Sequence, residues 1–137
     1  MDTLWNKVKM PAIQAALELW RNHPAKAVEL LQSATPYERA YSYVMYLRGL
    51  AYLEGRDGPK AAAEFQKIAD HKGAHLMRMA GGPYYPLSFL GLARAAVMSG
   101  DTAKAKKAYQ DFLTLWKDAD PDLAPLIQAR KEYAALQ

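Results

Sequence analysis

Apolar residues return every three or four positions along most of the chain, between short stretches rich in glycine, proline and polar residues. This spacing is typical of helices that bury one face, because a helix brings every third or fourth side chain to the same side. The breaks read RNHP, GRDGP and SGD, and such residues mark turns between helices. The pattern therefore predicts helices over residues 3–20, 24–34, 38–53, 59–71, 85–99 and 102–119, and a last helix after the stretch DADPD.

Several residues fit the starts of these helices. Pro24 and Pro59 suit a first turn, where a missing N–H breaks no hydrogen bond. Asp101 follows a glycine and is expected to cap the helix that begins after it. The carboxylates of DADPD, in residues 118–122, are expected to cap the last helix, because the glycine and the distant glutamate of a calcium loop are missing around them.

Two stretches share one order of small and large residues. Residues 48–65 read RGLAYLEGRDGPKAAAEF, and residues 92–109 read LARAAVMSGDTAKAKKAY. A weaker copy, AALELWRNHPAKAVELL, lies near the start of the chain. The matched positions are Ala15 and Ala27 in the first copy, Gly49, Tyr52, Ala61 and Phe65 in the second, and Ala93, Ala105 and Tyr109 in the third. The period is 34 residues, or 44 where ten residues are inserted, and it predicts stacked helical hairpins.

Small residues at these positions would let the two helices of a hairpin approach closely. The small residue of each first helix would face the alanine of the second helix, as Gly49 would face Ala61. The larger residue four positions after that alanine, such as Phe65, would fill the gap between neighbouring hairpins. Each hairpin leaves one apolar face uncovered, so stability would come from stacking the hairpins on one another.

This pattern resembles the tetratricopeptide repeat, whose signature is Leu-Gly-x-x-Tyr followed by Ala-x-x-x-Phe. The middle copy places Gly49, Tyr52, Ala61 and Phe65 at the signature spacing. The resemblance covers residues 11–118 and implies an all-α fold, a right-handed α-α superhelix of three hairpins with a C-terminal capping helix. An array of helical hairpins outside this family is the alternative.

The resemblance also implies how the chain is divided. Residues 1–137 would form a single repeat domain. Its parts would be repeats at 8–40, 42–75 and 86–119, an insertion at 71–85 and a capping helix at 122–137.

Longer stretches point to a narrower resemblance. The third hairpin and tail, from GLARAAVMSGD to the last residue, and RGLAYL with AAAEFQKIADH resemble the C-terminal repeat region of bacterial eukaryotic-like Ser/Thr kinases and related winged-helix regulators. This implies a regulatory or sensor domain, excised from such a protein or standing alone. It would be a soluble domain, cytoplasmic by default and extracytoplasmic if its parent is a membrane-anchored kinase. The chain itself has no Gly-rich phosphate loop, no His-Arg-Asp and no Asp-Phe-Gly.

In such arrays the first helix of each hairpin lines the concave face. The resemblance therefore implies a peptide groove that begins at Ala12, Ala16 and Leu19 and continues through Tyr43, Tyr46, Leu50, Leu53, Leu87, Leu90, Arg94 and Val97. It would hold an amphipathic helix or an apolar peptide, with Arg94 meeting an acidic group. Two alternatives stay open: the tyrosines, Tyr84 and Tyr85 included, pack on each other or on the insertion, or a homodimer covers this surface.

Composition and charge narrow the chemistry. The 137 residues include no cysteine, so disulfides and thiolate metal sites are excluded. The formal net charge of +4 is mild, and Lys104, Lys106 and Lys107 are expected on a solvated helix face, not on a nucleic-acid surface. No apolar run approaches the ~20 residues of a membrane-spanning helix, and the start lacks the apolar core of a signal peptide.

The remaining candidates for chemistry are histidines. His71 and His75 are four residues apart, but Gly73 weakens the helix between them and no third ligand stands at a useful spacing. No pairing of a serine with a histidine and an acid is evident in the sequence. We therefore expect a protein without catalysis, metal or cofactor that binds a protein or peptide segment, and neither binds nucleic acid nor inserts into a membrane.

Overall fold

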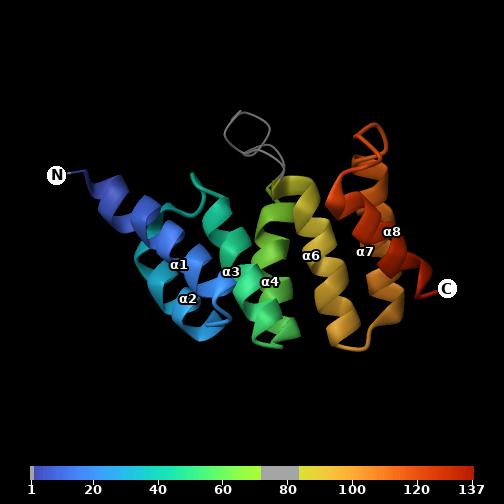
Figure 1. Cartoon of the computed structure of the whole chain (residues 1–137), viewed down its shortest axis with the longest axis horizontal. Coiled ribbons are helices and arrows are strands. Elements are labelled where there is room, and N and C mark those ends of the chain that lie inside the picture. The colour runs from blue at the N-terminus through green and yellow to red at the C-terminus, as the bar shows by residue number, and fades with distance from the viewer. Residues whose placement is uncertain (1, 72–83) are drawn as a thin grey trace.

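The computed structural model describes residues 2–71 and 84–137, and these residues form helices joined by turns (Figure 1). No strand occurs in these two ranges. The elements follow one another as η1 (Trp5–Lys9), α1 (Met10–Trp20), α2 (Pro24–Leu31), η2 (Gln32–Tyr37), α3 (Tyr43–Glu54), α4 (Gly58–Ala69), α6 (Tyr84–Met98), α7 (Thr102–Leu115) and α8 (Ala124–Ala134). The all-α fold expected from the sequence is confirmed.

Consecutive helices pair into three hairpins, which stack side by side along the long axis of the molecule (Figure 1). Within the hairpins α1 packs on α2, α3 on α4 and α6 on α7. Between the hairpins α2 packs on α3, and α4 packs on α6. The last helix, α8, lies against α7 at the C-terminal end, so the expected α-α superhelix with a helix at its end is confirmed.

The turn inside each hairpin is built in the same way. Asn22, Arg56 and Gly100 have positive φ angles of 63°, 64° and 78°, and they are separated by the same 34 and 44 residues as the sequence repeat. The next N–H after each of them donates back to a carbonyl five residues earlier, at 2.7, 2.8 and 2.9 Å. A left-handed residue followed by this hydrogen bond ends a helix and reverses the chain.

The second helices begin as their sequences predict. The Asp101 carboxylate accepts a hydrogen bond from the Lys104 N–H at 3.1 Å, which confirms it as a helix cap. The Asp57 carboxylate does the same for the Lys60 N–H, also at 3.1 Å. Prolines occupy the first turns of α2 and α4, as expected.

The capping expected for the last helix was wrong. Leu123 stands at the N-cap of α8, and no side chain caps this helix. Pro125 lies in its first turn, and this fixes the N-cap two residues earlier, beyond the aspartates. Asp120 instead accepts a hydrogen bond from the Asp122 N–H at 2.9 Å, within the preceding turn.

The opening helix passes through Pro11 without a break. A proline lacks the N–H that would bond the carbonyl four residues earlier, which here belongs to Lys7. The Ser33 hydroxyl in η2 donates to that carbonyl at 2.9 Å. The hydrogen bond ties the start of the chain to the segment after α2, a segment that Pro36 keeps from continuing as an α-helix.

Two boundaries around η2 differ from the sequence prediction. The helix predicted over 24–34 ends as an α-helix at Leu31, and the helix predicted to begin at residue 38 begins at Tyr43. Residues 32–37 form the tighter 3-10 helix η2. The apolar spacing continued through this segment and did not reveal the change in helix type.

Buried side chains form two core clusters, and α3 packs against both. The first cluster lies between η1, α1, α2, η2 and α3, around Val8, Ala27 and Leu31. The second lies between α4, α6, α7 and α8, around Phe65, Tyr109 and Phe112. All five alanines among the repeat positions are fully buried: Ala15, Ala27, Ala61, Ala93 and Ala105. Tyr52 is half-buried, with the Lys60 ammonium 5.7 Å above its ring.

Phe65 occupies a slot between the second and third hairpins. A Cβ atom added to Gly49 on α3, or to Gly91 on α6, would come within 2.6 Å of the Phe65 ring. Atoms cannot approach that closely without displacement, so both positions require glycine while the ring stays in place. The sequence repeat pointed to Gly49, but not to Gly91.

Candidate interaction groove

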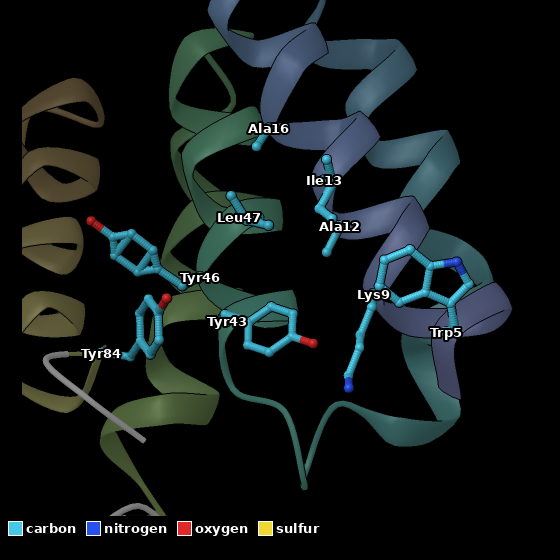
Figure 2. A pocket seen from close by; sticks show the side chains of 9 residues that line it. All are labelled: Trp5, Lys9, Ala12, Ile13, Ala16, Tyr43, Tyr46, Leu47 and Tyr84. Atoms are coloured by element: carbon cyan, nitrogen blue, oxygen red, sulfur yellow. The ribbon is translucent and has the colours of Figure 1, made fainter. Parts of the chain in front are cut away.

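An apolar groove of about 620 Å³ lies between the first two hairpins. Figure 2 shows residues of η1 and α1 facing residues of α3 across it, with one tyrosine from the start of α6. The groove is lined by Trp5, Lys9, Ala12, Ile13, Ala16, Tyr43, Tyr46, Leu47 and Tyr84.

Helical spacing places these side chains on one surface. The residues from η1 and α1 recur every three or four positions, so they share one side of the opening helix. Ala12 and Ala16 leave room that larger residues would occupy. One repeat later, α3 carries Tyr46 and Leu50 at the equivalent positions. Tyr46 lines the groove and also packs on Phe65, while Leu50 packs against the C-terminal core cluster, so α1 has only methyl groups where α3 has large side chains.

Tyrosines form one wall of the groove. The ring of Tyr84 lies 5.3 Å from that of Tyr46 and 6.4 Å from that of Tyr43, between ring centroids (Figure 2). Tyr46 also packs edge-on against Phe65, with centroids 5.8 Å apart. The tyrosines therefore pack on each other and still line the groove.

The hydroxyls of Tyr43 and Tyr46 stay protonated at neutral pH. Burial raises the pKa of Tyr46 above its ordinary value, and burial likewise raises that of Tyr43. A protonated phenol both donates and accepts a hydrogen bond. The wall therefore offers polar groups at the edge of an apolar surface.

The structure places the residues expected in the groove in several different environments. Tyr43 and Tyr46 line it, as do Ala12 and Ala16. Leu90 is buried in the core cluster of the C-terminal half. The others expected there do not line it: Leu50, Leu53 and Leu87 pack against that same cluster, Leu19 packs against the N-terminal cluster, and Val97 is exposed.

Arg94 already meets an acidic group within the chain. Its expected role was to meet an acidic group of a bound peptide, but its guanidinium donates to Glu132 of α8 at 3.0 Å from Nε and 2.9 Å from Nη2. Nη2 also lies 3.3 Å from the Gln128 side-chain oxygen. The last helix thus satisfies this cation inside the chain.

Glu132 is held as a carboxylate by this arrangement. Burial alone would raise its pKa, yet hydrogen bonds from Arg94 and Tyr109 bring the pKa below its ordinary value. The Tyr109 hydroxyl donates to Glu132 at 2.9 Å. Burial raises the pKa of Tyr109, and the neighbouring carboxylate raises it further. These contacts join α6, α7 and α8 through one polar cluster.

A second polar cluster, which the sequence repeat did not reveal, joins the second hairpin to the segment that connects it to the first. The Arg48 guanidinium donates to Glu38 at 2.9 Å and to both Glu64 oxygens at 3.1 Å. It also donates to the Thr35 hydroxyl at 3.1 Å, and Lys67 lies 3.3 Å from Glu64. A signal was present: Arg48 and Glu64 are single charges in apolar runs, each next to a repeat position.

The described residues contain no group of three side chains able to hold a metal ion. His71 lies with Nδ1 2.7 Å from the Lys67 carbonyl, while His75 and Gly73 lie outside the described residues. Lys107 pairs with Asp111 one helical turn later, at 3.2 Å. Within residues 2–71 and 84–137, none of the helices has both the length and the hydropathy needed to cross a membrane.

Comparison with known proteins supports the repeat. A family model described as Tetratricopeptide repeat matches residues 87–119, which include most of α6 and all of α7. No curated protein and no solved structure matches the chain. The comparisons thus support a tetratricopeptide-like hairpin in the third repeat, and they supply no kinase or winged-helix relative.

Proposed function

We propose that the protein is an interaction module that binds a helical or extended protein segment in the groove between its first two hairpins, without catalysing a reaction. Tetratricopeptide repeats are generally protein–protein interaction modules, and the family match supports this class. The observation that carries the proposal is the groove itself.

The lining of the groove suits a protein ligand. Trp5, Tyr43 and Tyr46 are of the types that contribute most to binding at protein interfaces. Ala12 and Ala16 leave a floor wide enough for apolar side chains of a ligand, as in recognition modes where a helix lies in a groove.

Lys9 replaces Arg94 as the cation of this surface. It lines the groove, and no carboxylate among the described residues pairs with it. An acidic group on the bound segment would meet Lys9 at the end of the groove near Trp5 (Figure 2). We therefore still propose that one cation beside the apolar surface binds an acidic group of the ligand, but this cation is Lys9 and not Arg94.

A regulatory or sensor role beside a kinase or a DNA-binding module would use the same surface. Nothing in the described residues favours that setting, and no relative of that kind was found. The proposal therefore rests on the groove and on the family match.

Filling the groove tests the proposal. Ala16 is exposed on the groove floor, so Ala16→Phe places a ring in the ligand's space without entering the core. Ala63, exposed on α4, gives the matched control Ala63→Phe. Peptides would be selected from a displayed library of random 16-residue sequences on the unaltered protein, and their affinities measured by calorimetry.

We expect the selected peptides to bind Ala16→Phe at least tenfold more weakly than the unaltered protein, and to bind Ala63→Phe equally well. Peptides that bind Ala16→Phe without loss would place the binding surface elsewhere. A selection that yields no binder at all would contradict the proposed function.

A further inference from the structure

The outer side of α1 carries large apolar side chains that the chain leaves uncovered. Met10, Ile13, Leu17 and Trp20 are 36%, 51%, 47% and 86% exposed. They follow one another at intervals of three, four and three residues, so they form one stripe along the helix, the outer stripe. Only Ile13 also lines the groove, so the stripe is a separate surface.

The same helix is apolar on its inner side. Val8, Ala12 and Ala15 are buried against the first core cluster. A surface helix ordinarily has a polar side opposite its buried one, and the end elements of stacked arrays have polar outer faces because nothing covers them. The exposed Trp20 breaks this rule most clearly, and tryptophan is the type that most often dominates binding energy at interfaces.

The other end of the array shows what covers such a surface. There α8 lies against the third hairpin and buries Leu126 and Ala129. Its carboxylate, Glu132, meets the cation Arg94 at 2.9 Å. A helix with an apolar stripe and a flanking acid thus closes the C-terminal edge of this molecule.

Charge around the outer stripe favours acidic groups on its occupant. On one side Lys9 lines the groove. On the other side Leu17 borders a hollow of about 260 Å³ that contains Arg21, Lys26 and Glu18. Glu18 is already engaged, by His23 at 2.7 Å and Arg21 at 3.2 Å. Lys9 forms no ion pair among the described residues, and Lys26 lies near Glu18 without a direct ion pair to it, so positive charge exceeds negative charge on both sides of the stripe.

We propose that the outer stripe binds an amphipathic helix of a partner protein whose apolar side chains are flanked by carboxylates. The partner's apolar residues cover Ile13, Leu17 and Trp20, and its acids reach Lys9 and Lys26. A second copy of this chain fits less well, because its own stripe brings the same cations to the interface.

A library of displayed helices tests this partner chemistry. Each helix has a fixed leucine stripe, and its flanking positions vary among glutamate, lysine and serine. Selection on the full chain is expected to enrich glutamate. The selected helix should bind Leu17→Ser/Trp20→Ser at least tenfold more weakly, while both substitutions leave thermal melting unchanged because the residues are exposed.

Matched controls separate this surface from the groove and from general stickiness. Leu123→Ser/Ile127→Ser removes two exposed apolar residues at the other end of the molecule and should change the affinity less than twofold. Ala16→Phe, which fills the groove, should also leave this helix bound. Lys9→Glu/Lys26→Glu should weaken the glutamate-flanked helix and strengthen its lysine-flanked counterpart.

Three results would overturn the proposal. The first is enrichment of lysine or serine flanks, or no preference at all. The second is binding that Leu17→Ser/Trp20→Ser does not change. The third is a concentration-dependent dimer of the unaltered protein in sedimentation that the same substitutions dissociate, since a second copy would then occupy the stripe. None of these results bears on the groove, which Ala16→Phe tests separately.

Discussion

The two ends of the helical array differ in how they meet solvent. At the C-terminal end α8 covers the last hairpin, buries Leu126 and satisfies Arg94 with Glu132. At the N-terminal end α1 exposes its outer stripe, and the groove beside it is open. The C-terminal edge is closed by the chain itself, while the described residues leave the N-terminal edge available to another molecule.

Equivalent repeat positions show the origin of this difference. Ala16, Leu50 and Arg94 are related by the 34- and 44-residue periods. The alanine forms part of the groove, the leucine packs on the core and the arginine binds α8. The sequence repeat determines where the helices lie. The environment of the equivalent position on each first helix depends on the neighbouring element: it lines the groove in the first hairpin, packs on the core in the second and contacts α8 in the third.

The largest expected effect compares one leucine from each end. Leu126 is a residue of α8 that is only 1% exposed, so Leu126→Ala should lower the free energy of unfolding by about 2–5 kcal/mol, because it leaves a cavity. Leu17 is exposed on α1, so Leu17→Ala should change it by about 0.5 kcal/mol or less. Urea denaturation followed by circular dichroism measures both. Equal losses of unfolding free energy in the two variants would contradict the proposed difference between the ends, because they would show that Leu17 is as buried as Leu126.

The second largest effect is expected in the middle hairpin, which packs against the hairpins at both ends. Gly49→Leu should cost about 2 kcal/mol, because the new side chain meets the Phe65 ring. The same substitution should cost much less in a Phe65→Ala background, where the slot is empty. Ala63→Leu on the exposed side of α4 is the control. A melting temperature of Gly49→Leu equal to that of the unaltered chain would refute the close contact.

A smaller effect tests the polar contact that closes the C-terminal edge. Glu132→Gln should cost about 1 kcal/mol or less at pH 7, because the Arg94–Glu132 pair is only partly buried. Burial opposes ionisation of Glu132, but its hydrogen bonds hold the pKa in the folded chain below the ordinary value of 4.5. Its contribution is therefore full above that value and is lost as the pH falls through the lowered pKa.

The measurement is the stability difference between the unaltered chain and Glu132→Gln at a series of pH values. We expect the difference to shrink below about pH 4.5. The exposed Lys107–Asp111 pair supplies the control Asp111→Asn, which should have a smaller effect at every pH. A difference that grows towards low pH would contradict the polar contact at Glu132.

Much of the fold followed from the sequence, because turn residues and small residues have local causes. The breaks RNHP, GRDGP and SGD lie at the three hairpin turns, and Asp101 caps its helix. The requirement for glycine at position 91 was not predicted, because the equivalent residues in the other copies are Ile13 and Leu47 and no small residue repeats at this position. Its need for glycine depends on the Phe65 ring, which reaches it from another hairpin.

The candidate surfaces were harder to predict, because they depend on how elements stack. The resemblance to the tetratricopeptide repeat suggested Tyr43 and Tyr46, which line the described groove, and Arg94, which is instead paired with Glu132 of α8. The docking of α8 leaves no mark in the repeat. The outer stripe was missed for a related reason. When a helix is apolar on two sides, spacing alone does not tell which side faces inward.

The central claim is that binding takes place at the N-terminal end of the array. The three tryptophans report on it directly, since Trp5 lines the groove, Trp20 lies in the outer stripe and Trp116 packs on Phe112 near the other end. Their indole N–H signals can be followed by nuclear magnetic resonance during titration with the selected peptides. We predict that the groove peptide shifts Trp5, the acidic helix shifts Trp20, and neither shifts Trp116. A shift confined to Trp116 would contradict the account.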